Sequence, residues 1–214
     1  VFKASEVGIA QINFIKYMKD TYGLDTSKVG IIFQDNDPGR DGAEASKKNA
    51  EAAGLTVVAF EAFPIGSADM SPQVVKLMDS GAEIVLLTGD INDCKQVLAA
   101  MKTYDYKPLV IGGGAGFLIQ EFAKALGDTA VGVTTVATYA FDAKHVKENE
   151  VLNGLVNELF TRYGIYPSSY EMGLMSETIS LVAALEKSGS RDRKVLRDTL
   201  KEMEHTTFAI GSPM

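Results

Sequence analysis

Apolar runs alternate with polar, helix-forming stretches along the first two thirds of the chain. Short apolar runs at residues 29–34, 56–61, 83–87, 108–111 and 131–137 have the length and composition of buried strands. The four segments between them carry helix-forming residues or apolar residues at helical spacing, and three of these segments end at a glycine. This alternation predicts an α/β fold with a doubly wound, parallel, five-stranded sheet over residues 28–138.

Helical patterns flank this region on both sides. Residues 5–22 form an amphipathic pattern that ends at Gly23. Beyond residue 139 the pattern is helical, at residues 149–163, 170–187 and 192–203, with a short candidate strand at 207–210. Consecutive helices cannot extend the sheet, so we expect them to form another layer or to pack across its end. The expected parts are therefore residues 1–27, 28–138 and 139–214.

The first strand exit is the leading candidate for a binding site. Open α/β sheets hold ligands at the carboxyl ends of their strands. Residues 35–42 follow the first strand, where they are expected to form a polar loop, and Asp90 follows the third strand. Each position also has a purely structural interpretation, because Asp and Asn before Pro-Gly suit a plain turn and Asp90 suits a helix cap.

Composition excludes several kinds of site. The net charge of −7 argues against a nucleic-acid partner, which needs clustered Lys and Arg. The single cysteine, Cys94, is expected to be a small buried hydrophobe, and His145 and His205 have no metal-ligand pattern around them. We therefore expect neither a catalytic group nor a metal or other cofactor. No apolar run is long enough to span a bilayer, so direct membrane insertion of this chain is not expected.

The glycine run at residues 112–116 follows a strand and precedes a helix. It follows the fourth strand, however, and lacks the Lys-Ser/Thr pair of a phosphate-binding loop. A tight turn or a close approach of the backbone to a ligand explains the glycines better.

Several motifs in order resemble a known family. They include Lys28-Val-Gly-Ile-Ile, Gly39-Arg-Asp-Gly42, Gly81-Ala-Glu-Ile-Val-Leu-Leu, Phe160-Thr-Arg-Tyr-Gly164 and Gly189-Ser-Arg-Asp192. Over nearly the whole chain, this order resembles the type I periplasmic binding proteins, specifically the branched-chain amino-acid and amide receptors of ABC importers.

The resemblance implies a receptor with two α/β lobes, which close around a solute at a hinge. This chain then looks like a fragment that holds lobe two, the helix leading in from lobe one (residues 1–27) and helices returning toward lobe one (residues 139–214). The implied function is capture of a small polar solute, such as an amino acid, an amide or a related metabolite, without catalysis. The implied partner is the membrane permease of an ABC importer, and the implied location is periplasmic or extracellular, with the signal outside this piece.

Carried onto this sequence, the resemblance implies ligand contacts from three strand exits. The candidate residues are Asp35, Asn36, Pro38, Gly39, Gly89, Asp90, Asn92, Gly113 and Gly114. Amino-acid receptors of the family often place an aromatic residue and an acid where this chain has Pro38 and Gly114. An α-amino-acid ligand would therefore need Asp90 or Asp35 to bind its ammonium group.

Two alternative functions remain open at the level of sequence. One is a flavodoxin-like receiver or enzyme in which Asp35 and Asp37 form an acidic pocket for Mg²⁺. The other is a sensor ectodomain that uses the same cleft. Stabilisation by Mg²⁺ would favour the first alternative over a solute receptor.

Overall fold

A computed structural model describes residues 4–118, 120–137, 139–140, 147–148 and 150–203. The chain divides into two compact units, Val1–Val136 and Ala137–Met214, each of which is described by itself. The candidate strand at 207–210, together with His145 and His205, lies outside the described residues.

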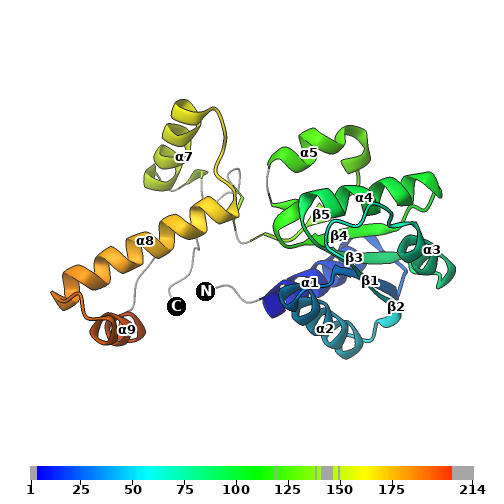
Figure 1. Ribbon diagram of the computed structural model, residues 1–214, viewed down its shortest axis with the longest axis horizontal. Helices are drawn as coiled ribbons and strands as arrows, with labels where there is room; N and C mark the ends of the chain where they lie inside the picture. The colour runs from blue at the N-terminus through cyan, green and yellow to red at the C-terminus, as the bar shows by residue number, and fades with distance from the viewer. Residues whose placement is uncertain (1–3, 119, 138, 141–146, 149, 204–214) are drawn as a thin grey trace. The chain divides into compact units, whose positions relative to one another are not determined.

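The first unit is built on a parallel sheet in the order β2-β1-β3-β4-β5 (Figure 1). The strands are β1 (Lys28–Gln34), β2 (Thr56–Phe63), β3 (Ile84–Thr88), β4 (Leu109–Gly113) and β5 (Thr134–Thr135). This arrangement confirms the predicted five-stranded parallel sheet. The fifth strand is shorter than the predicted 131–137, because residues 131–132 form a turn in which Gly132 has a φ of +85° and Val131 is 81% exposed.

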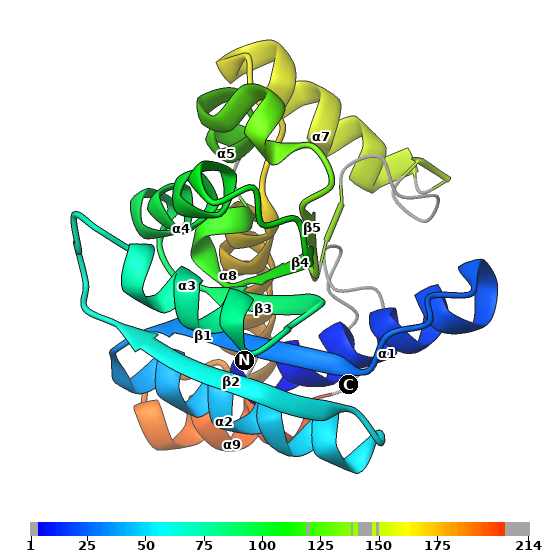
Figure 2. The same cartoon turned by 90° about the vertical axis from the view of Figure 1, so that its right-hand side faces the viewer.

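Helices cover both faces of this sheet, as expected for a doubly wound fold. Figure 2 shows α1 (Ala4–Tyr22) and α2 (Asp37–Ala52) on one face, with α3 (Ser71–Asp79) and α4 (Ile91–Thr103) on the other. A short helix, α5 (Gln120–Leu126), adds Phe122 to the core under α3 and α4. Strand β3 contributes side chains to the apolar core on each face of the sheet. Ile84 and Leu86 pack on the side of α1 and α2, and Val85 and Leu87 pack on the side of α3 and α4.

Helix α2 begins at Asp37, six residues earlier than the predicted start at Ala43. The prediction of a loop over residues 35–42 is therefore wrong for residues 37–42. Asn36 is the N-cap, and its Oδ1 accepts a hydrogen bond from the backbone N–H of Gly39 at 2.7 Å. Pro38 lies in the first turn, where its fixed φ suits a helix and its missing N–H costs nothing. The polar residues read as a loop are thus the start of the helix, and only Asp35 and Asn36 precede it.

Helix α3 has no capping side chain at its N-cap position. Ser71 is its first residue, and the N-cap residue Met70 makes no side-chain hydrogen bond to the helix. Asp69 takes over the capping role, because its Oδ1 accepts a hydrogen bond from the Ser71 N–H at 2.8 Å. Hydrogen bonds from the Ser71 side chain and backbone lower the pKa of Asp69.

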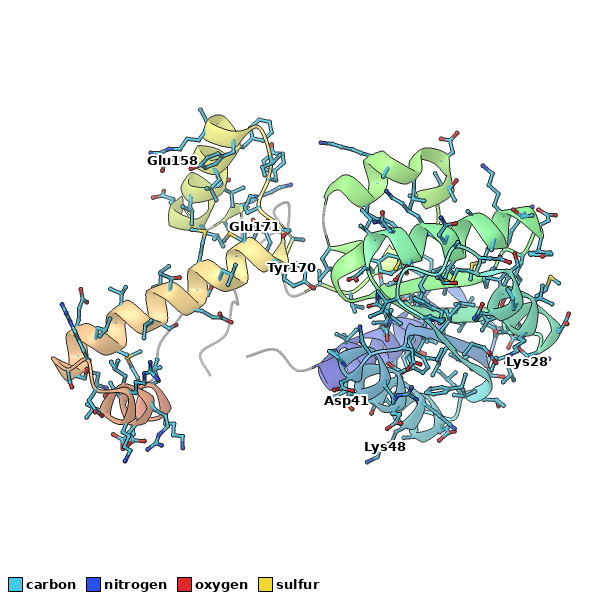
Figure 3. All side chains as sticks on the ribbon, in the orientation of Figure 1. Lys28, Asp41, Lys48, Glu158, Tyr170 and Glu171 are labelled. Atoms are coloured by element: carbon cyan, nitrogen blue, oxygen red, sulfur yellow. The ribbon has the colours of Figure 1, made fainter. Side chains whose placement is uncertain are left out.

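The second unit consists of helices α7 (Glu150–Tyr163), α8 (Ser169–Ser188) and α9 (Arg193–Glu202) in its described part. Leu152 and Val156 of α7 form a small core with Met172 of α8 and Tyr139. Ser168 and Glu171 form a capping box at the start of α8, which Figure 3 marks by Tyr170 and Glu171. Within the described residues, no helix is both long and apolar enough to cross a membrane.

Candidate functional site

The carboxyl ends of β1 and β3 lie side by side at the point where the strand order reverses. From β1 the chain crosses to β2 on one side, and β3 then pairs with β1 on the other side. Such a switch point is where open α/β sheets bind ligands, because the helices that follow the two strands lie on opposite faces. Figure 3 orients the unit: Asp41 in the early part of α2 marks this edge, and Lys28 at the start of β1 marks the opposite edge.

The side chain of Gln34 connects the exits of these two strands. Its Nε2 donates to Oδ2 of Asp90 at 3.1 Å and to Oδ2 of Asp93 at 2.7 Å. Its Oε1 accepts a hydrogen bond from Nδ2 of Asn36 at 2.8 Å. Gln34 is only 4% exposed, so these hydrogen bonds replace the water that its carboxamide would otherwise bind.

Asp93 brings the segment between β2 and α3 into the same network. Asp93 is 3% exposed; its Oδ1 accepts a hydrogen bond from the Gly66 N–H at 3.1 Å, and its Oδ2 accepts one from Nε2 of Gln34. Hydrogen bonds to an ionised acceptor are stronger than neutral ones, which offsets part of the cost of burying this group. We call Gln34, Asn36, Asp90 and Asp93 the exit network.

At the first exit, most of the predicted site residues have local roles. The carboxylate of Asp35 forms an ion pair with the guanidinium of Arg40, with both side chains about half exposed. Asn36 uses both ends of its amide, toward Gln34 and toward Gly39. Gly39 is buried and Pro38 is exposed. This exit therefore presents an already paired carboxylate and a proline ring to solvent.

At the third exit, Asp90 presents a carboxylate to solvent. It is exposed and occupies the N-cap position of α4, yet its side chain makes no capping hydrogen bond to the helix. Asn92 is exposed in the first turn of α4. Gly89 is buried, and a Cβ at this position would lie 2.9 Å from Cζ of Phe63. Asp90 and Asn92 are thus the accessible polar groups among the predicted residues of this exit.

The glycines of the fourth exit serve close packing in this structure. A Cβ on Gly113 would lie 2.8 Å from Cγ1 of Val7, and one on Gly112 would lie 2.4 Å from the ring of Phe117. Gly114 has a φ of +87°, which side chains disfavour. Gly116 donates its N–H to the carbonyl of Gly89 at 3.0 Å, which joins the fourth exit to the third. The run is a tightly packed turn, and the backbone of Gly113 and Gly114 remains a proposed ligand contact.

Sequence reasoning missed Gln34 and Asp93. Gln34 was assigned to the end of the apolar first strand, and Asp93 lies within a helix. The available signal was polarity: Gln34 is the only uncharged polar side chain in β1, at its carboxyl end. Its partners Asp90 and Asp93 could not be read from the sequence, because they lie 56 and 59 residues away.

Cys94 is a fully buried part of the core, which confirms its interpretation as a small hydrophobe. Burial raises the pKa of its thiol, and the nearby charges of Asp93 and Asp90 raise it further. The thiol therefore stays protonated and is a poor nucleophile.

The residues of the proposed Mg²⁺ pocket are not brought together as a metal site. Asp35 is paired with Arg40, and Asp37 lies in the first turn of α2 with an exposed side chain. Across the part of the chain that the structure describes, His, Cys, Asp and Glu side chains form no group of three or more that could hold a metal ion. The geometry gives this alternative no support.

The chain is similar to known proteins over most of its length. A family model described as "Periplasmic binding protein" matches residues 8–213. The Leu/Ile/Val-binding protein homolog 8 of Brucella abortus (strain 2308) is 36% identical over 143 residues, which cover 66% of this chain and 36% of that protein. The aligned part is thus well under half the length of this curated relative.

Solved structures show the same fold. A leucine binding protein, LivK, from Thermotoga maritima superposes with a TM-score of 0.82 at 17% identity, covering 98% of this chain and 57% of that one. A fatty acid ABC transporter substrate-binding protein from Thermomonospora curvata gives a TM-score of 0.77 at 18% identity, covering 97% and 54%. At these identities the likeness concerns the fold.

Proposed function

This chain belongs to the periplasmic binding protein family, and we propose that it forms the second lobe and the hinge-side helices of a solute receptor of an ABC importer. The relative at 36% identity is named a binding protein, and we assign this chain a binding role and not an enzymatic one. We further propose that residues 1–27 lead in from lobe one and that residues 139–214 return toward it. The receptor would act in the periplasm or outside the cell, with a membrane permease as its partner.

The exposed carboxylate of Asp90 at the switch point is the observation that supports this proposal most. It lies where open α/β sheets bind ligands, and it accepts a hydrogen bond from the buried Gln34. A solute bound there would meet Asp90 and Asn92 from the third exit, Asp35 and Pro38 from the first, and the glycine turn of the fourth. The other residues of the predicted site, Asn36, Gly39 and Gly89, would act mainly by shaping these exits.

We propose that the solute carries an ammonium or amide N–H group, which Asp90 binds. Asp35 is the weaker candidate for this role because Arg40 already neutralises its carboxylate. A carboxylate without an ammonium group would be repelled by Asp90. This argument favours an amino acid, as in the name of the Brucella relative, over a fatty acid, as in the name of the Thermomonospora structure.

The test is calorimetric titration of the complete protein that contains this chain. The probes are L-leucine, L-isoleucine and L-valine, each compared with its analogue that lacks the amino group, such as 4-methylpentanoate for leucine. We expect at least one amino acid to bind and its des-amino analogue to bind at least about tenfold more weakly, because a charge-assisted hydrogen bond is lost. Asp90→Asn should weaken the binding of the amino acid by a similar factor.

The matched control is Asp79→Asn, which neutralises an exposed carboxylate at the end of α3 and should leave binding unchanged. Equal binding of the amino acid and its des-amino analogue, or unchanged affinity in Asp90→Asn, would contradict the proposed ligand chemistry.

A further inference from the structure

We propose that Gln34 is a positioning residue that fixes the carboxylate of Asp90 at the ligand-binding edge. This inference rests on the proposed function and deepens it, because it assigns a role to a buried residue that cannot itself reach a ligand. Gln34 is 4% exposed, whereas Asp90 is exposed.

The carboxamide of Gln34 has one favourable orientation in this site. With Nε2 toward Asp90 and Asp93, both carboxylates receive a hydrogen bond, and Oε1 accepts from Nδ2 of Asn36. Reversal of the amide would place Oε1 against two carboxylate oxygens and Nε2 against another N–H donor. Each contact would then be lost or repulsive, and a buried polar group without a partner is destabilising. The neighbours of Gln34 therefore lock its orientation.

The hydrogen bond from Nε2 of Gln34 takes the place of a helix-capping hydrogen bond at Asp90. An Asp at an N-cap position ordinarily accepts a hydrogen bond from the first turn of its own helix. Asp90 does not, and its Oδ2 is bound to Gln34 instead. The hydrogen bond thus holds an exposed carboxylate toward the β1 exit. Asp93 cannot replace it as a ligand contact, because it is buried and bound to Gly66 and Gln34.

The two hydrogen bonds of Gln34 can be separated by mutation. Gln34→Glu keeps the shape of the side chain but removes both Nε2 donors and places a third carboxylate beside Asp90 and Asp93. In the double variant Gln34→Glu/Asp93→Asn, Nδ2 of the new amide can donate to the new carboxylate, which restores a bond between β1 and α4. The bond to Asp90 stays broken in both variants.

The proposal predicts that affinity and stability respond differently in these variants of the complete protein. Gln34→Glu should lower Tm and weaken L-leucine binding at least about tenfold, as expected for the loss of an oriented charged contact. The double variant should regain most of the lost Tm but not the affinity. If Gln34 had only a structural role, affinity would return together with Tm, and wild-type affinity in the double variant would overturn the proposal.

Tyr106→Phe is the matched control for stability. It removes the 2.6 Å hydrogen bond from the Tyr106 hydroxyl to the Ala82 carbonyl, at the opposite end of β3. This variant should lower Tm and leave the affinity for L-leucine unchanged.

A second measurement needs no ligand. In ¹H–¹⁵N spectra of the free protein, the Gln34 side-chain amide is assigned by its disappearance in Gln34→Glu. Asp90→Ala should shift these resonances and speed the solvent exchange of the amide protons, because one acceptor is removed. Unchanged resonances would overturn the positioning role. If L-leucine does not bind the wild-type protein but the resonances shift, the proposed ligand fails while the positioning of Asp90 stands.

Discussion

At the scale of single residues, Gly39 shows how a missing side chain shapes the first strand exit. The chain leaves β1 and enters α2 within two residues, which brings Gly39 against the carbonyl of Gln34. A Cβ on Gly39 would lie 2.1 Å from that oxygen, a separation that neither atom can relieve without moving the backbone. The turn also carries Asn36, so the backbone at Gly39 and the exit network depend on each other.

Gly39→Ala should therefore destabilise the protein by about 1–3 kcal/mol, as overpacking does, and weaken solute binding. Chemical denaturation measures the first effect and calorimetry the second. Gly154→Ala is a control of opposite sign, because Gly154 is an exposed helical glycine with no atom within 4 Å of an added Cβ. It should stabilise its helix by about 0.5–1 kcal/mol. A Gly39→Ala variant as stable as wild type would show that the turn can relax.

At the scale of elements, the capping box of α8 makes that helix sensitive to acid. A hydrogen bond from Ser168 lowers the pKa of Glu171 below its ordinary value of 4.5. The folded state therefore holds this proton less readily than the unfolded state, so the contribution is present above the ordinary pKa and lost as pH falls below it.

Glu171→Gln should reduce helix stability near neutral pH and flatten its decline as pH falls below the ordinary pKa of 4.5. Thermal unfolding followed by circular dichroism at several pH values measures both effects. Ser168→Ala, which removes the hydrogen bond but keeps the carboxyl group, should flatten the decline as well. A decline as steep as wild type in both variants would place its origin elsewhere.

The elements that the sequence predicts well are those whose pattern lies within one continuous segment. The strands at 29–34 and 83–87 are recognisable as apolar runs, and the helices around them by helix-forming composition or helical spacing. Asp37 through Gly42 were misassigned as loop because Asp, Pro and Gly favour both a turn and the first turn of a helix. Only the contact between Asn36 and Gly39 decides between them.

The same reasoning explains what was missed in the site. Asp90 could be placed at the third exit from its position after an apolar run, and the structure has it there, exposed. Its orientation could not be predicted, because it depends on Gln34, which is 56 residues away in the chain. Long-range polar contacts leave no periodic pattern in a sequence.

At the scale of the whole molecule, the two units have separate cores and different architectures. The first holds two apolar layers around its sheet, and the second holds a small cluster between α7 and α8. A solute that binds the folded receptor and not the unfolded chain should stabilise the folded state.

We expect that millimolar Mg²⁺ will leave Tm unchanged, whereas a bound amino acid will raise it in a concentration-dependent manner. Differential scanning fluorimetry of the complete protein compares the two directly, with KCl at matched ionic strength as the control. A rise in Tm with Mg²⁺ beyond that of the salt control would favour the receiver or enzyme alternative with its acidic pocket.

The exit network also has a consequence for how this protein could acquire a new specificity. Its members come from β1, the start of α2 and the start of α4, and Asp93 holds the Gly66 loop as well. A change at Asp90 alone would leave a donor of Gln34 unpaired, and a change at Gln34 alone would leave two carboxylates without their shared donor. Substitutions at these positions should be epistatic, so a change of ligand specificity would need coordinated replacements. Grafting one loop from a relative would not transfer that relative's ligand specificity.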